Sequence, residues 1–82
     1  MFLVTINVRY LQSVVNPEEE VLSETVVKMG MSAVQSVKVG RTYTLRIAAD
    51  SKQDAENTGK ELAEKLLVNK AMETYSLNIE EA

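Results

Sequence analysis

Residues 2–10 read FLVTINVRY, and apolar side chains occupy every even position of this stretch. Thr5, Asn7 and Arg9 stand between them and face the other way, because successive side chains of a strand point to opposite faces of a sheet. This alternation predicts a strand with one buried face and one polar face. Such a strand needs neighbours to bury its apolar side.

Three later stretches alternate in the same way and predict three further strands, over residues 34–39, 42–48 and 72–80. Gly40 lies between the first two of them. A bulge at Gly40 would pair Val39 with Tyr43 and keep the apolar faces matched, so we expect a hairpin turn at this point. The predicted inward side chains are Val37, Val39, Tyr43, Leu45, Ile47, Tyr75, Leu77 and Ile79.

The first of two predicted helices follows the first strand. Asn16 suits its cap, Pro17 its first position and Glu19 the acidic position of a capping box. Gly30 suits its end as a left-handed residue. The apolar stripe expected to face the core consists of Leu22, Val26 and Met29.

The second predicted helix begins after Ser51, with Asp50 as a competing cap. Gly59 stands on its apolar stripe, where it weakens the helix by about 1 kcal/mol relative to alanine. We expect a close approach of helix and sheet to compensate for this loss. Asn69 marks the stop, and the apolar stripe consists of Ala55, Gly59, Leu62, Ala63, Leu66 and Leu67.

The predicted order of elements is βαββαβ within a single domain, residues 1–82. Right-handed crossovers then lead to an α+β fold, a ferredoxin-like two-layer sandwich. This sandwich has a four-stranded antiparallel sheet with two helices on one face.

Composition excludes several classes of function. The 82 residues contain no cysteine and no histidine, which rules out disulfides, Cys/His zinc sites and catalysis by a thiol or an imidazole. A net charge of −3 argues against nucleic acid as a partner. With no apolar run long enough to span a membrane and no signal peptide, we expect a cytoplasmic protein. Because so short a chain has a small core, we also expect it to oligomerise.

No catalytic, cofactor-binding or metal-binding residue is predicted. The carboxylates of Glu18–Glu20 and Glu80–Glu81 lack any neighbour in the sequence that would desolvate them, so solvated surface is the preferred interpretation. Gly30, Gly40 and Gly59 are isolated and form no phosphate-binding loop.

Three short segments resemble the PurS family, the small subunits of phosphoribosylformylglycinamidine synthase. Val37-Lys38-Val39-Gly40-Arg41 is similar to the family's Val-Arg-Val-Gly-Lys turn, and Val14-Val15-Asn16-Pro17 to its Val-Leu-Asp-Pro helix entry. Leu66-Leu67-Val68-Asn69 followed by Glu73-Thr74-Tyr75 is similar to its Leu-Leu-Ala-Asn-Pro-Val-Ile-Glu-Asp-Tyr passage. The chain departs from the family pattern at Leu11-Gln12-Ser13 and at Lys70, where the family carries Lys-Pro-Gly and Pro.

The resemblance implies a non-catalytic subunit of an ATP- and glutamine-dependent enzyme of purine biosynthesis. It implies PurL and PurQ subunits as partners, which the chain would bridge so that ammonia passes between them, with ATP and Mg held by the large partner. A homodimer or homotetramer is expected. The candidate partner contacts are Gly40, Arg41, Asn69 and Lys70, although Gly40 is equally well explained by a need for positive φ.

Other interpretations of the βαββαβ order remain open. An amino-acid-binding regulatory module would bind at the loop after the first strand, here Tyr10–Ser13. An acyl phosphatase would need an Arg and an Asn that converge on an anion, and Asn7 with Arg9 is the only neighbouring pair. An RNA-recognition module would need aromatic residues on the exposed sheet face, where this chain has Thr, Asn and Arg.

Overall fold

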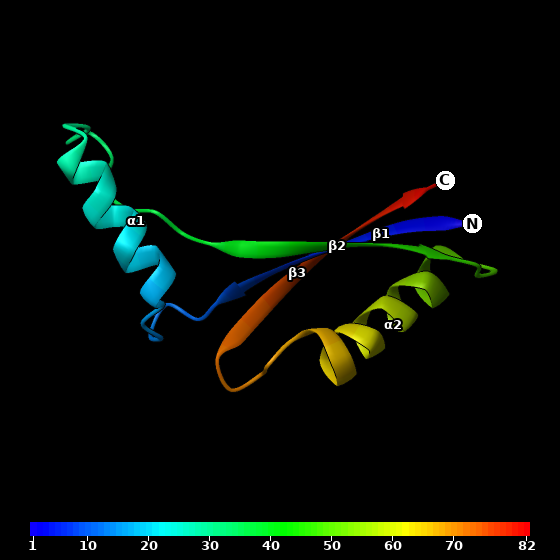
Figure 1. Cartoon of the computed structure of the whole chain (residues 1–82). Coiled ribbons are helices and arrows are strands. Elements are labelled where there is room, and N and C mark those ends of the chain that lie inside the picture. The colour runs from blue at the N-terminus through cyan, green and yellow to red at the C-terminus, as the bar shows by residue number, and fades with distance from the viewer.

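The computed structural model describes residues Met1 to Ala82 and has three strands and two α-helices, the second of which ends in a π-helical turn (Figure 1). The sheet has the order β2-β1-β3, and both strand pairs are antiparallel. The α+β class predicted from the sequence is confirmed. The elements are β1 (Phe2–Tyr10), α1 (Pro17–Lys28), β2 (Gly40–Ile47), α2 (Lys52–Leu62), η1 (Ala63–Leu67) and β3 (Glu73–Glu81).

The central strand β1 buries its apolar face beneath α2. Val4 lies between Leu45 and Ile79 in the register of the sheet, and Ile6 lies between Tyr43 and Leu77. These neighbours belong to the predicted inward set, so the alternation identified the buried face of all three strands. The buried side chains of β1 are Phe2, Val4, Ile6 and Val8.

Helix α2 lies close to the sheet because of a glycine. A Cβ atom at Gly59 would stand 3.0 Å from Cγ1 of Val4 and 3.1 Å from Cδ1 of Leu77, so a larger residue would crowd these two side chains. The predicted cap is also present, since Oγ of Ser51 accepts a hydrogen bond from the Asp54 N–H at 3.1 Å.

The prediction for Leu66 is wrong, because the π-helical turn η1 rotates this side chain into solvent, where it is 73% exposed.

Residues 11–39 form an arm that leaves one end of the sheet and carries α1 away from it (Figure 1). The rest of the chain, the sheet with α2 and η1, is called the body below. The molecule measures 51 × 27 × 13 Å, and its radius of gyration is 16.3 Å. A compact chain of this length would have a radius of gyration of about 12 Å. No residue of α1 is buried, so the arm contributes nothing to the core of the body.

The predicted ends of α1 are confirmed, and its capping box is not. Oδ1 of Asn16 accepts the Glu18 N–H at 2.9 Å, and Gly30 adopts a left-handed φ of 81° just beyond the helix. Oε2 of Glu19 accepts instead the N–H of Val39 at 2.7 Å, because this carboxylate points toward the returning chain. Glu19 therefore connects α1 to residues 34–39 rather than to its own cap.

The predicted four-stranded sheet with two helices on one face is wrong for this chain. Gly40 makes no turn. It is the first residue of β2, it pairs with Arg9 of β1, and its φ is not positive. Residues 34–39 therefore run straight on into β2, beyond the end of the sheet, where no strand of the chain lies beside them (Figure 1). Without the hairpin they form no strand, and α1 stays with them instead of folding over the sheet.

Candidate partner-binding site

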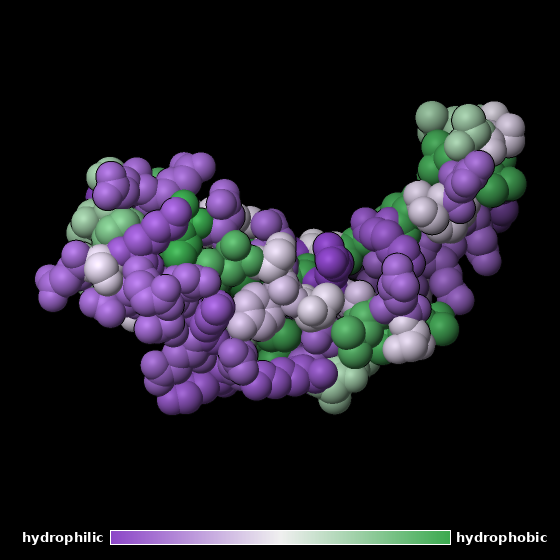
Figure 2. All heavy atoms as spheres, turned by 180° about the vertical axis from the view of Figure 1, so that it is seen from behind, coloured by the Kyte–Doolittle hydropathy of each residue, from purple (hydrophilic) through white to green (hydrophobic).

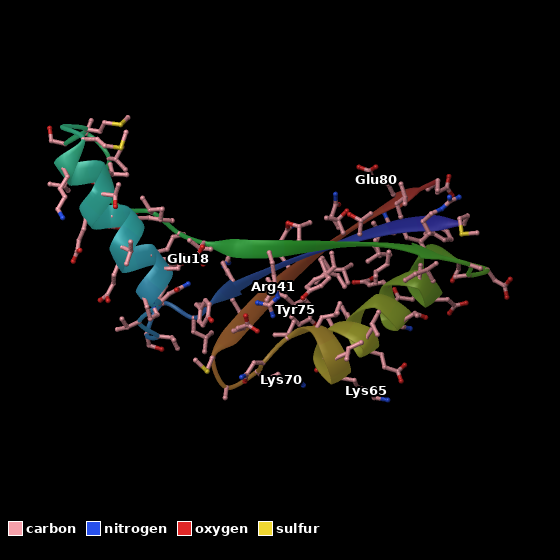
Figure 3. All side chains as sticks on the ribbon, viewed as in Figure 1. Glu18, Arg41, Lys65, Lys70, Tyr75 and Glu80 are labelled. Carbon is pink, nitrogen blue, oxygen red and sulfur yellow. The ribbon has the colours of Figure 1, made fainter.

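The four predicted contact residues come together at the base of the arm. Gly40 and Arg41 begin β2, and Asn69 and Lys70 lie in the loop between η1 and β3. Figure 3 shows Arg41 and Lys70 on the side of the sheet that faces α2. The chain thus brings residues almost thirty positions apart into one corner, which we call the base corner (Gly40, Arg41, Asn69, Lys70 and Glu73).

Arg41 is the centre of the base corner. Its guanidinium forms a bidentate ion pair with Glu73, through Nη1 to Oε2 at 2.5 Å and Nη2 to Oε1 at 2.9 Å. Nη2 also donates to the Leu67 carbonyl oxygen at 2.8 Å, and Nε donates to the Tyr43 hydroxyl at 2.8 Å. Arg41 therefore links the start of β2 to the end of η1 and the start of β3.

Glu73 is the buried partner of this pair. Its side chain is 6% exposed, against 44% for the side chain of Arg41, and its Oε1 also accepts the Asn69 N–H at 2.9 Å. Hydrogen bonds from Arg41 hold the pKa of the Glu73 carboxyl below its ordinary value of 4.5, although burial acts in the opposite direction. Its hydrogen bond to Glu73 likewise raises the pKa of Arg41. Both groups stay charged near neutral pH, so the pair positions the loop and does not exchange protons.

Lys70 holds the other side of the same loop. Its Nζ lies 2.5 Å from Oε1 of Glu64, whose Oε2 accepts the Tyr75 hydroxyl at 3.2 Å. The hydrogen bond from Lys70 lowers the pKa of the Glu64 carboxyl, and burial is the main cause that raises the pKa of Tyr75. The loop is therefore fixed to η1 as well as to β2.

Gly40 has a different role from the one its sequence suggests. A Cβ atom there would stand 2.6 Å from the Val8 carbonyl oxygen, a distance that real Cβ atoms do not adopt. The need for positive φ is therefore the wrong explanation. Glycine is required because two backbones approach closely where β2 joins β1.

A second surface of the molecule was missed by the sequence analysis. Five apolar side chains on the arm are between 49% and 69% exposed. Figure 2 shows that apolar surface gathers at the far end of the arm. Met29, which was expected in the core, is one of these five side chains. We call this set the arm surface: Val15, Val21, Val27, Met29 and Met31. A clustered set of exposed apolar side chains is typical of an interface with another protein.

No group of three or more carboxylate side chains is placed so that it could hold a metal ion. Neither helix combines the length and the apolar character that a membrane crossing needs. What the geometry provides is a rigid corner and an exposed apolar arm.

The sequence did contain a signal for the buried ion pair. Arg41 shares its parity with Tyr43, Leu45 and Ile47, and Glu73 shares its parity with Tyr75. Two opposite charges at inward positions of the two strands beside β1 predict a partly buried pair, because an unpaired charge there would be costly. This alternation could have identified Glu73 and Tyr43 as residues of the site. It could not have predicted the exposure of the arm.

Comparison with known proteins places the whole chain in one family. The family model for PurS, phosphoribosylformylglycinamidine (FGAM) synthase, matches residues 3–81. The phosphoribosylformylglycinamidine synthase subunit PurS of Bacillus subtilis (strain 168) is 32% identical, over 99% of this chain and 95% of that protein.

Two solved structures agree with this assignment. A crystal form of Bacillus subtilis PurS superimposes with a TM-score of 0.87 at 32% identity, and the match covers 99% of this chain and 100% of that one. A chain in the structure of PurLQS from Thermotoga maritima gives a TM-score of 0.88 at 26% identity, and the match covers 96% of both chains. The resemblance read from three short segments thus extends over the full length. The chain belongs to the PurS family of FGAM synthase.

Proposed function

We propose that this chain is the small subunit of an FGAM synthase that joins a PurL synthetase to a PurQ glutaminase. In that role it lets ammonia released from glutamine reach the ATP-dependent site without loss to solvent. The observation that carries the proposal is the match of residues 3–81 to the PurS family. A relative at 26% identity occurs in a structure described as PurLQS, which supports PurL and PurQ as the partners.

In this proposal the chain contributes surfaces, and its partners contribute the reacting groups. ATP and Mg belong to the large partner subunit, and the chain binds neither. We propose the cytoplasm as the place of action, because the ATP and glutamine that the reaction consumes are cytoplasmic metabolites. A molecule 51 Å long and 13 Å thick suits a bridging role, since it offers a large surface for its mass.

The arm surface suits a second copy of the chain. Tyr43, Leu45 and Ile47 on β2 are only partly buried by α2, and the outer edge of β2 has no strand beside it. An apolar helix and an extended segment from another molecule would fill both places. We propose a homodimer in which α1 and residues 34–39 of one copy complete the helix layer and the sheet of the other. The two-layer sandwich would then be formed between copies.

The base corner is proposed as a contact for a partner subunit. Asn69 and Lys70 present the loop, and Arg41 with Glu73 holds it in place. Arg41 acts here as a positioning residue, because its guanidinium is already occupied within the chain. Replacement of Arg41 would therefore weaken partner binding through the loop rather than through a lost contact.

The test is a glutamine-dependent amidine-forming assay with PurL and PurQ, in the presence and absence of this chain. We expect the rate to depend on its addition. An ammonium salt in place of glutamine provides the control, since free ammonia needs no transfer and the dependence should then largely disappear. Full glutamine-dependent activity without the chain would overturn the proposal.

A further inference from the structure

A hollow of about 650 Å³ lies where the arm joins the body. Its volume is within the range of small-molecule sites in proteins, about 300 to 1,000 Å³. Figure 3 shows Glu18, the neighbour of one lining residue, at the end of α1 that is nearest to the sheet. The body lines the hollow with Arg9, Tyr10 and Thr74, and the arm lines it with Leu11, Gln12, Glu19 and Lys38.

Arg9 is the positive charge that the body contributes to this hollow. It occupies the last outward position of β1, where Thr74 of β3 pairs with it in the register of the sheet. The residue is exposed and forms no ion pair within the chain, whereas Arg41 is paired with Glu73. A guanidinium without a partner can bind a carboxylate through two parallel hydrogen bonds.

Glu19 is the negative charge that the arm contributes. Its side chain is 13% exposed, and its Oε2 is fixed by the N–H of Val39 at 2.7 Å. Its Oε1 lies 3.6 Å from Nζ of Lys38, which is too long for a hydrogen bond. The carboxylate is therefore held in place by one oxygen, and the other oxygen is free to accept a hydrogen bond from a ligand.

Charges of both signs thus meet in one hollow, and they come from two regions of the chain. An α-amino acid carries the same two charges, since its carboxylate and its ammonium group stand on one carbon atom. A phosphate dianion would match Arg9 but would meet the like charge of Glu19, which is unfavourable. We propose that the hollow binds a free α-amino acid, with its carboxylate at Arg9 and its ammonium group at Glu19.

The rest of the lining determines which amino acids fit. Tyr10 and Thr74 contribute hydroxyl groups, and Gln12 contributes an amide. These groups donate and accept hydrogen bonds but carry no charge that could balance another one. The site therefore suits an amino acid with a neutral polar side chain, and L-glutamine is the probe for the test.

A bound amino acid would connect the arm to the body. Its two charged groups would be held by β1 on one side and by α1 on the other, and a ligand stabilises the conformation that binds it. We expect slower amide hydrogen exchange in residues 34–39 and in the first turn of α1. Exchange in the centre of β1, which is buried without a ligand, should stay the same.

The test is a titration of the purified full chain with L-glutamine, followed by shifts in its amide NMR spectrum. For a ligand of this size we expect a Kd of about 1 mM or tighter. Arg9→Gln and Glu19→Gln each remove one charge, and Glu19→Gln keeps an oxygen for the N–H of Val39. Each should raise the Kd at least about tenfold, because each removes one charged hydrogen-bond partner of the ligand.

Matched variants and ligands define the outcomes. Arg46→Gln and Glu18→Gln remove the same charges outside the hollow and should leave the Kd unchanged. Glutaramate, which is glutamine without its amino group, should bind more weakly, and inorganic phosphate should not compete. The proposal is overturned if L-glutamine near its solubility limit does not bind, if phosphate displaces it, or if Arg9→Gln and Glu19→Gln bind as well as the two controls.

These outcomes are separate from the test of the proposed function. The chain is titrated alone, so a failure to bind an amino acid leaves the amidine-forming assay with PurL and PurQ unaffected. Circular dichroism checks that every variant is folded.

Discussion

The body and the arm contain similar apolar residues but use them in different ways. The body places Phe2, Val4, Ile6 and Val8 beneath α2, where each is at most 7% exposed. The arm leaves Val21 61% exposed, and α1 buries none of its twelve residues. A helix of this length is marginal in water by itself. The body therefore has a core of its own, and the arm needs a cover from another molecule.

This difference separates two kinds of stability. The unfolding free energy of the body should remain substantial at dilutions where the chain is monomeric, because its core contacts lie within one chain. The unfolding free energy of the arm should rise with protein concentration, because a bound partner stabilises the folded form by mass action. Substitutions matched between the two regions can test this division.

The largest effect is expected in the body. Ile6 is 0% exposed and lies between Tyr43 and Leu77 in the sheet. Ile6→Ala should lower the unfolding free energy by about 3 kcal/mol, from lost transfer energy and the cavity left behind. Urea titration at two protein concentrations measures it, and the loss should be equal at both. A loss that varied with concentration would mean that the arm of the partner copy contributes to the packing of Ile6 itself.

The next effect is expected at the base corner, where the arm joins the body. Glu73→Gln removes the charge beside Arg41 while it keeps an oxygen for hydrogen bonds. We expect a loss of about 2 kcal/mol at pH 7, less than for a fully buried pair because Arg41 is partly exposed to solvent.

The loss should depend on pH in one direction. The folded pKa of Glu73 is below the ordinary value of 4.5, so the carboxylate stabilises the fold above that value. This contribution disappears as pH falls below 4.5 through the folded pKa. Urea titrations of wild type and Glu73→Gln should therefore converge in acid. Glu61→Gln, at an exposed pair with Lys65, is the matched control and should change little. A difference in unfolding free energy between wild type and Glu73→Gln that persisted at low pH would mean that the loss comes from packing and not from charge.

A smaller effect is expected on the arm surface. Val21→Gln with Val27→Gln replaces two exposed valines by residues that a helix tolerates. We expect the dissociation constant of the homodimer to rise about tenfold or more, since each side chain that a partner buries contributes about 1 kcal/mol or more. Sedimentation equilibrium measures it. The variant and wild type should unfold alike at dilutions where both are monomeric, and a difference there would show that the arm packs on its own body.

The sequence predicted the body better than the arm, for a physical reason. Alternation along β1, β2 and β3 depends on which side chains α2 covers, and that contact lies within the chain. The cap at Ser51 and the close approach at Gly59 are equally local to the body. The course of the chain at Gly40 could not be predicted from such local contacts, because glycine fits both a turn and a close backbone approach. Only the register with Arg9 decides between them.

The same ambiguity limited the prediction of the site. Gly40, Arg41, Asn69 and Lys70 were chosen by resemblance, and the structure brings them to one corner without testing their contact with a partner. Glu73 could have been predicted from the alternation of inward and outward residues alone. The exposure of the arm was not, because an apolar stripe at helical spacing looks the same whether its cover lies in the same chain or in another.

The smallest effect compares two helix caps of the same chemistry. Oγ of Ser51 accepts the Asp54 N–H at 3.1 Å, and Oδ1 of Asn16 accepts the Glu18 N–H at 2.9 Å. Loss of either cap costs its helix about 1 kcal/mol. Because α2 covers the core, Ser51→Ala should lower the global unfolding free energy by that amount at any concentration.

Asn16→Ala should behave otherwise, because α1 covers nothing in its own chain. In dilute solution it should speed amide hydrogen exchange within residues 18–22 and leave the urea midpoint of the body unchanged. In concentrated solution the same change should weaken the dimer, because a frayed α1 must become ordered again before a partner can bind it. Equal losses of global stability from both caps at high dilution would show that arm and body unfold as one unit. The exposed valines of α1 would then need an explanation other than a missing partner.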